Sequence, residues 1–151
     1  MTARQRAKYW LYNSVPGFRG RFPYFGTTVH FPPHAVLLHA VCAEGIFEAP
    51  IVHRMVKFAT PGTTVFDVGA NLGLMSVAVL AERRDCRVVS FEPSPSSLPY
   101  LERTRAGSAD ADRWTVIGAA VAERAGELDF AIGSPAEGLY EGFRSGDRLA
   151  G

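Results

Sequence analysis

The stretch from Thr63 to Pro93 constrains the fold most strongly, because it reads as a strand, a glycine-rich bend, a helix and a second strand in direct succession. The β-branched and aromatic run at 64–68 predicts a buried strand, and Gly-Ala-Asn-Leu-Gly at 69–73 predicts a tight bend. Apolar residues at helical spacing predict a helix over 74–84, and the strand pattern returns over 87–91. This succession is typical of a βαβ unit. We therefore predict an α/β fold built on a parallel sheet.

The second expected strand is followed directly by an acid, Glu92, which has a functional interpretation. A carboxylate about 20 residues beyond a glycine bend can accept both hydroxyls of a ribose. The glycines themselves let a ligand lie close to the helix N-terminus. The same carboxylate could instead cap the next helix, where a negative charge contributes roughly 0.3 to 1 kcal/mol. We predict that Glu92 binds a ribose.

The bend departs from the dinucleotide fingerprint G-x-G-x-x-G at two positions. If Gly69 is the first glycine, Asn71 and Leu74 stand where the second and third are required. A side chain at Asn71 crowds the approach of a pyrophosphate. S-adenosylmethionine has an adenosine and a ribose but no phosphate, so the bend favours it. A nicotinamide or flavin oxidoreductase is the alternative, and a glycine-rich turn without any nucleotide is the plainer one.

Two motifs in this stretch carry a family resemblance. Residues 65–73 (Val-Phe-Asp-Val-Gly-Ala-Asn-Leu-Gly) and 89–95 (Val-Ser-Phe-Glu-Pro-Ser-Pro) resemble the D-[VI]-G-A-N-x-G and E-P-x-P signatures of FkbM-type S-adenosylmethionine-dependent methyltransferases. The resemblance covers residues 47–132. It implies a Rossmann-like class I methyltransferase fold and methyl transfer, usually to a hydroxyl of a sugar, a polyketide or a related metabolite.

The motifs also supply a set of expected cofactor-binding residues. These are Asp67, Gly69, Ala70, Asn71, Gly73 and Glu92. Asp67 could face the ammonium of the cofactor's methionine part or hold backbone amides, and Asn71 could bond the ligand carboxylate or its own loop; these alternatives stay open.

No catalytic residue is assigned from the sequence. The candidate bases are the histidines, of which His53 and His30 are the best placed, although a lone histidine is more often structural. All four lie in the first part of the chain: His30, His34, His39 and His53. Neither they nor the two cysteines, Cys42 and Cys86, have the spacing of a metal site, and no metal is expected.

Charge is distributed unevenly along a chain whose net charge is only +1. Residues 1–60 hold seven basic side chains against two acidic ones, a balance of +5, which leaves −4 for the remainder. This bias is compatible with an anionic partner, but a solvated surface is the preferred interpretation, and no nucleic-acid partner is expected.

The first part of the chain reads as a flank rather than as a targeting or membrane segment. Residues 9–34, rich in aromatic residues, proline and glycine, predict irregular structure with short strands that packs over the sheet edge, 26–31 being the best strand. The run 35–43 is helical or buried extended and is far shorter than the roughly 20 residues of a membrane span, and 48–59 predicts a helix. We expect a cytoplasmic protein without a membrane partner.

The last part of the expected domain contains a helix, a strand and a hairpin. The helix is expected to begin at Ser94 and Pro95, unless Pro99 moves its start toward Leu98. A third strand is predicted over 114–117. A strand pair is predicted over 121–132, with Gly126 in its turn.

These features divide the chain into three parts. Residues 1–46 form the flank or lid, 47–132 the first half of a cofactor-binding domain, and 133–151, with glycines and few apolar residues, a poorly ordered tail. In the family further strands normally follow, so we expect an incomplete methyltransferase with an open sheet edge. A second chain that completes the sheet, or a non-catalytic remnant or partner subunit, is the third functional alternative.

Overall fold

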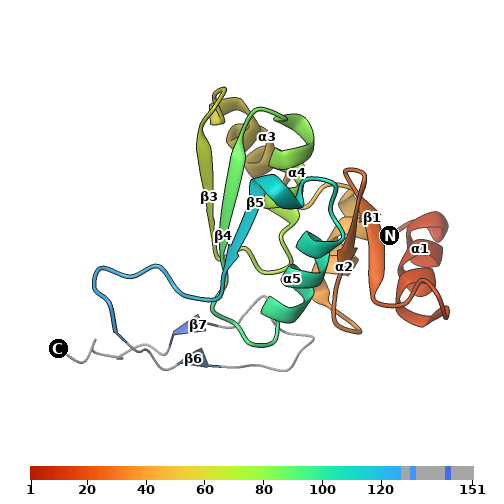
Figure 1. Cartoon of the computed structure of the whole chain (residues 1–151). Coiled ribbons are helices and arrows are strands. Elements are labelled where there is room, and N and C mark those ends of the chain that lie inside the picture. Colours follow the sequence, from red (N-terminus) through yellow and green to blue (C-terminus); the bar gives the residue numbers. More distant parts are fainter. Residues whose placement is uncertain (127–129, 132–141, 144–151) are drawn as a thin grey trace.

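The computed structural model describes residues 1–126 and the backbone of two short strands, β6 (Phe130–Ala131) and β7 (Gly142–Phe143), but not residues 127–129, 132–141 and 144–151. The described part is built around a parallel sheet of the order β3-β4-β5 (Figure 1). Its strands are β3 (Thr64–Val68), β4 (Arg87–Phe91) and β5 (Trp114–Ile117). The predicted parallel α/β core is confirmed.

Two helical crossovers join the strands and lie on the same side of the sheet (Figure 1). Helix α4 (Leu74–Glu82) links β3 to β4, and α5 (Leu98–Ala106) with the short helix η1 (Ala111–Arg113) links β4 to β5. Successive crossovers of the same hand place both helices on one face when the strand order runs in one direction. The arrangement agrees with the predicted Rossmann-like class I methyltransferase fold.

The two faces of the sheet differ in burial. Val88 and Trp114 are almost fully buried on the helical side. On the opposite face, the side chains of Phe66 and Val68 are 63% and 60% exposed in the described part of the chain. The sequence predicted a buried strand at 64–68, and this is wrong for one face, because a run of β-branched and aromatic residues does not show which of its two faces is covered.

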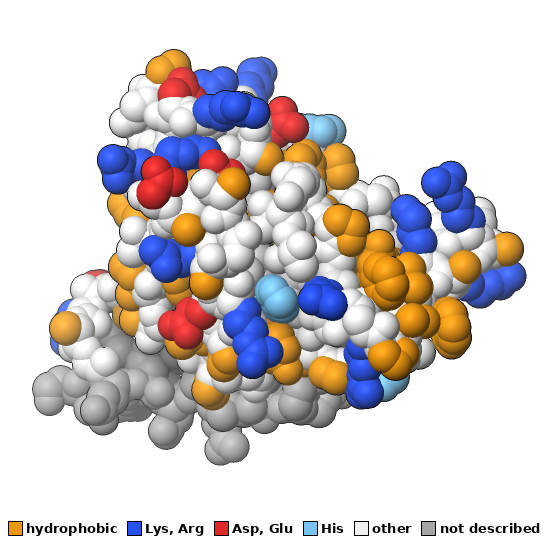
Figure 2. All heavy atoms as spheres, turned by 45° about the vertical axis from the view of Figure 1, so that its right-hand side comes forward, with side chains coloured by type: hydrophobic (Ala, Val, Ile, Leu, Met, Phe, Trp, Pro, Cys, Tyr) orange, Lys and Arg blue, Asp and Glu red, His pale blue; other side chains and the backbone are white. Residues whose placement is uncertain are grey.

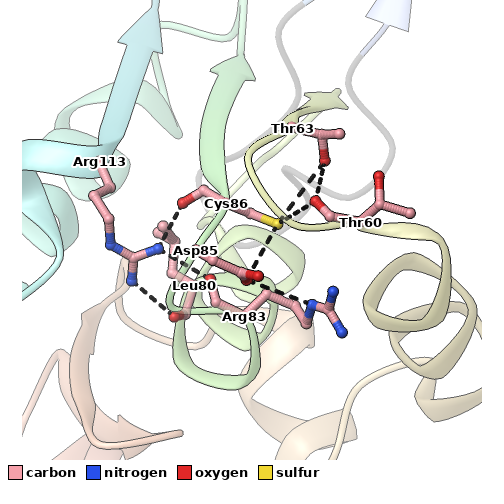
Figure 3. A network of polar contacts seen from close by, with 7 residues as sticks. All are labelled: Thr60, Thr63, Leu80, Arg83, Asp85, Cys86 and Arg113. Atoms are coloured by element: carbon pink, nitrogen blue, oxygen red, sulfur yellow. Dashed lines mark hydrogen bonds and ion pairs between the residues drawn. The ribbon is translucent and has the colours of Figure 1, made fainter.

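At the end of the sheet opposite the bend, the Arg113 side chain binds several backbone carbonyl groups (Figure 3). The Arg113 guanidinium donates to the carbonyl oxygens of Leu80 and Arg83 at 3.0 Å and of Cys86 at 2.6 Å. Its ion pair with Asp110, at 2.6 Å, holds it in place. A positive charge at the last carbonyls of α4 satisfies acceptors that have no partner within the helix and complements the helix dipole.

The N-terminal flank contains helices and a hairpin. Its elements are α1 (Ala3–Ser14), β1 (Arg21–Tyr24), β2 (Thr27–His30), α2 (Val36–Glu44) and α3 (Ala49–Phe58). The predicted strand near 26–31 and the helix predicted over 48–59 are confirmed, whereas α1 was not predicted. Thr2 and Gln5 form a capping box at the start of α1, and this signal is readable in the sequence.

The sequence predicted that this segment packs over the sheet edge. Instead, the hairpin packs against helix α5. Buried Thr104 of α5 accepts the His30 backbone N–H at 2.9 Å and donates to the Tyr100 carbonyl at 2.8 Å. Phe22 and Phe31 belong to the same core cluster as the residues of the central unit. The hydrophobic core is therefore continuous across the boundary predicted between residues 46 and 47.

Two sequence expectations for the later elements are wrong. Helix α5 begins at Leu98, the alternative start, because Ser94 Oγ instead accepts the N–H groups of Ser96 and Ser97 in a preceding turn. No strand forms between Val121 and Gly126, and Phe130–Ala131 pairs with β7 instead. The rest of the predicted strand pair, residues 127–129 and 132, and most of the tail 133–151 fall outside the described residues.

Within the described ranges, no single helix is long and apolar enough to cross a membrane. Helices α2 and α3 have the required length and composition only when they are taken together, and they are bent by 84° relative to each other. The described residues also contain no group of three or more His, Cys, Asp and Glu side chains that could hold a metal ion.

Gly69 and Gly73, at the two ends of the bend, differ in how much space surrounds them, and a matched pair of alanine substitutions tests this difference. Both have positive φ, +79° at Gly69 and +81° at Gly73. A Cβ at Gly69 would meet no atom within 4 Å, whereas one at Gly73 would lie 2.6 Å from Leu101 Cδ1 and 2.9 Å from Trp114 Cζ2. Gly69→Ala should lower the free energy of unfolding by about 1 to 2 kcal/mol. Gly73→Ala should lower it by about 3 kcal/mol or more, since overpacking adds to the backbone cost. Urea denaturation measures both, and equal losses would contradict this difference.

Candidate functional site

The bend between β3 and α4 is held by backbone hydrogen bonds to the end of β4. The N–H groups of Gly69 and Ala70 both donate to the Phe91 carbonyl, at 2.9 and 3.0 Å. Asn71 has a φ of +50°, a left-handed conformation that asparagine tolerates better than most residues. The predicted bend is therefore a shaped loop at the carboxyl ends of two parallel strands, where open α/β sheets bind ligands.

Glu92 points at this bend, as the ribose-binding prediction requires. Its carboxylate is buried; Oε2 accepts the Asn71 backbone N–H at 2.6 Å and Oε1 accepts the Ser94 N–H at 2.7 Å. The Asn71 amide belongs to the bend before helix α4, and the Ser94 amide to the turn before helix α5. A negative charge thus sits directly against an amide that a phosphate would otherwise use.

The side chain of Asn71 reaches across to the start of α5. Its Oδ1 accepts a hydrogen bond from Ser97 Oγ at 3.2 Å. The sequence left two roles open for Asn71, a bond to the ligand carboxylate or a bond to its own loop. The contact with Ser97 is a bond within the protein and so resembles the second role.

A buried chain of hydrogen bonds fixes the orientation of Asp67. Trp114 Nε1 can only donate, and it donates to Ser90 Oγ at 2.8 Å. Ser90 Oγ lies 2.6 Å from Ser76 Oγ, which in turn donates to Asp67 Oδ2 at 2.6 Å. With an ionised aspartate at one end and an indole at the other, every hydroxyl proton in the chain has one consistent direction.

The carboxylate of Asp67 anchors the first turn of α4, because Oδ2 also accepts the Ser76 backbone N–H at 3.2 Å. This contact resembles the tethering alternative, although the amide belongs to the helix and not to the loop. Burial raises the pKa of the Asp67 carboxyl, and the two hydrogen bonds from Ser76 offset part of that rise. Oδ1 makes no hydrogen bond to the described residues, so half of the carboxylate is left for another partner.

Asp67 also lines a hollow of about 490 Å³ between the bend and helix α3. The described residues around it include two acids, Asp67 and Glu48, and none is Lys, Arg or His. The others are apolar or belong to the bend: Leu37, Phe47, Ile51, Met55, Phe66, Val68, Gly69, Ala70, Asn71, Leu72, Leu74 and Met75. The hollow is therefore apolar with a negative bias, which favours a cationic ligand.

The structure divides the predicted site residues between two sides of the bend. Asp67, Gly69, Ala70 and Asn71 line the hollow, whereas Glu92 and Gly73 are not among its described lining residues. Gly73 is buried against Leu101 and Trp114 and has a packing role.

Sequence reasoning missed the contribution of helix α3 to the hollow. The sequence predicted a helix over 48–59 but gave Glu48, Ile51 and Met55 no place in the site. None of the four histidines lines the hollow, so the structure does not support His53 or His30 as a base there. His30 lies on the flank hairpin, where burial and the charges of Arg103 and Arg21 lower its pKa.

Comparison with known proteins adds little to this geometry. No protein-family profile and no curated protein sequence matches the chain. The chain is similar to the crystal structure of a candidate protein-L-isoaspartate O-methyltransferase from Plasmodium falciparum in complex with S-adenosyl-L-homocysteine, with 19% identity and a TM-score of 0.37. The match covers 75% of this chain and 50% of that chain, so the chain spans half the length of that protein. At this level the likeness carries no functional argument.

The raised pKa of Asp67 predicts how Asp67→Asn changes stability with pH. An unfolded aspartate has a pKa of about 3.9, so between that value and its higher folded pKa the folded state binds more protons than the unfolded state. The contribution of Asp67 to the free energy of unfolding therefore falls as pH rises through this window. The stability of Asp67→Asn relative to the native chain should rise from acid to neutral pH, as measured by urea denaturation.

Asp112→Asn, at an exposed aspartate, is the matched control, and any trend that both variants share is subtracted. A relative stability of Asp67→Asn that stays flat or falls with increasing pH would contradict the assigned direction.

Proposed function

We propose that this chain binds S-adenosylmethionine across the bend at 69–73 and acts in methyl transfer to a hydroxyl group of a small molecule. The observation that carries the proposal is the charge of the site. On one side of the bend, the Glu92 carboxylate accepts the hydrogen bond of the Asn71 amide. On the other side, the hollow is lined by two acids and by no described basic residue. Such a site suits a cationic, phosphate-free nucleoside.

The two sides of the bend suit the two ends of this cofactor. Glu92 is held in a fixed orientation by the Asn71 and Ser94 amides, and an acid at the end of the second strand is the group that accepts ribose hydroxyls in nucleotide-binding α/β folds. Asp67, with Oδ1 unengaged among the described residues, faces the side on which the ammonium and sulfonium would lie. The open space beside Gly69 leaves room for the ligand to pass between them.

A dinucleotide is disfavoured by the same geometry. Its pyrophosphate needs free backbone N–H groups at the bend. The Asn71 N–H donates to Glu92 at 2.6 Å, so a phosphate would have to displace one anion and approach others.

The bound sulfonium would supply an already activated methyl group, and the chain's own residues would bind and orient it. Asp67 and Glu92 would hold the two ends, and the apolar wall of Ile51 and Met55 would exclude water. The base that takes the hydroxyl proton is left unassigned. The hydroxyl acceptor is part of the proposal, as is membership of the FkbM-type methyltransferases.

The uncovered sheet face supports a further part of the proposal, that other strands or a second chain complete this sheet. Phe66, Val68 and Ile117 are exposed on it, and β3 is an edge strand among the described residues. Two buried free thiols, Cys42 and Cys86, are compatible with a cytoplasmic location.

Glu92→Gln tests the proposal by calorimetric titration with S-adenosylhomocysteine and, separately, with NADH. The native chain should bind S-adenosylhomocysteine and not NADH. The substitution should raise the dissociation constant for S-adenosylhomocysteine about tenfold or more, the usual effect of losing a charged hydrogen-bond acceptor.

Glu102→Gln removes an exposed carboxylate from α5 and is the matched control, with unchanged affinity expected. Thermal unfolding of both variants separates lost affinity from lost folding. Binding of NADH in preference to S-adenosylhomocysteine, or unchanged affinity in folded Glu92→Gln, would overturn the proposal.

A further inference from the structure

Helix α1 turns two tyrosines, Tyr9 and Tyr12, and two uncharged polar side chains toward the rest of the fold. Gln5 Nε2 donates to the Ala43 carbonyl at 2.7 Å, and Asn13 Oδ1 accepts the His34 N–H at 3.0 Å. The Tyr9 ring packs edge-on against His39, with centroids 5.6 Å apart. These contacts hold α1 against α2 and determine which face of α1 is turned outward.

The outward face of α1 has an apolar centre. Ala3, Ala7 and Trp10 lie at helical spacing on one stripe and are exposed, and half-buried Leu11 continues it. The Trp10 side chain is 62% exposed. The fold thus uses Tyr9 and Tyr12 of α1 for packing and leaves Trp10 at the surface.

Basic residues flank this stripe, and no acid accompanies them. Arg4 and Lys8 lie along one side of it and Arg6 along the other, and all three are exposed. The sequence has no Asp or Glu before Glu44, and none of these cations forms an ion pair within the described part of the chain. Figure 2 shows Lys and Arg side chains together with hydrophobic ones, and no acidic ones, on the right-hand part of the molecule.

The segment after α1 also exposes an aromatic side chain next to basic ones. Phe18 is 50% exposed in the turn that follows the helix, and Arg19 and Arg21 beside it are exposed. Residues 1–43 thus combine five cations, no anion and two exposed aromatic side chains, Trp10 and Phe18.

We propose that the outer face of α1 docks on an anionic lipid surface, with Trp10 at the level of the head groups and the flanking cations on the lipid charges. An apolar stripe with tryptophan between rows of Lys and Arg is the pattern of helices that lie in a membrane interface. Each cation near such a surface adds attraction that salt screens. This contact is peripheral and differs from a membrane span, and the proposal departs from the expectation that the protein has no membrane partner.

The test is co-sedimentation of the full chain with vesicles of phosphatidylcholine alone and of phosphatidylcholine mixed with phosphatidylserine. Binding should require the anionic lipid and weaken with salt. Arg4→Glu with Lys8→Glu should lower the partition coefficient roughly tenfold or more. Trp10→Ala should lower it on the order of tenfold through loss of the inserted ring.

Matched controls lie on surfaces far from α1 in the chain. Arg84→Glu changes an exposed cation, and Phe58→Ala removes an apolar side chain that is 76% exposed. Neither should change the partition coefficient. Because Trp114 is 1% exposed, a blue shift of tryptophan emission on binding should report Trp10, and it should disappear in Trp10→Phe while sedimentation is retained.

Absence of binding to phosphatidylserine vesicles, or equal losses in the α1 variants and their controls, would overturn the proposal. Tighter binding to single-stranded RNA or to polyglutamate than to the anionic vesicles would also overturn it and assign the cationic face to a different class of partner. Circular dichroism of each variant confirms that an observed loss does not come from unfolding.

Discussion

The contact between the Glu92 carboxylate and the Asn71 amide, 2.6 Å long, is the interaction on which the rest of this structure depends. It ties the end of β4 to the crossover that begins after β3, and so connects two parallel strands at the edge where a ligand would bind. A buried amide without a partner would cost about 1 to 3 kcal/mol, and a carboxylate is the strongest partner that a side chain can offer. The same contact contributes to the negative charge of the site, because it places a carboxylate against a backbone amide of the bend.

A second polar connection aligns the sheet beneath the bend. Trp114 of β5, Ser90 of β4, Ser76 of α4 and Asp67 of β3 form one hydrogen-bonded chain through the core. Such a buried chain is stable only if every member is satisfied, so it demands a defined register of all three strands. Burial raises the pKa of the Asp67 carboxyl at one end of this chain, and the hydrogen bonds from Ser76 offset part of that rise.

The parts of the fold that sequence could predict are those whose pattern is local. The bend at 69–73, strands β3 to β5 and helices α3 and α4 follow from periodicity and glycine placement within a few residues. Helix α1 was overlooked although its Thr2–Gln5 capping box is local as well. The exposed face of β3 was not predictable, because burial of Phe66 depends on elements distant in the chain.

The candidate site was predicted in the same uneven way. The motif residues of the bend and Glu92 are found together because one βαβ unit positions them. Glu48 and Met55 reach the hollow only because α3 packs against α4, a long-range contact without a motif. Ser76 and Ser90 carry no signal at all, since serine in a helix or a strand is unremarkable until Asp67 and Trp114 are placed on either side of the pair.

A crystal structure of this chain with S-adenosylhomocysteine tests the central claim most directly. The account predicts the ribose hydroxyls within hydrogen-bonding distance of Glu92 while the Asn71 amide still donates to the same carboxylate, and the amino-acid end of the ligand beside Asp67. A ligand bound away from the bend, or a Glu92 side chain turned away from both the ribose and Asn71, would contradict it.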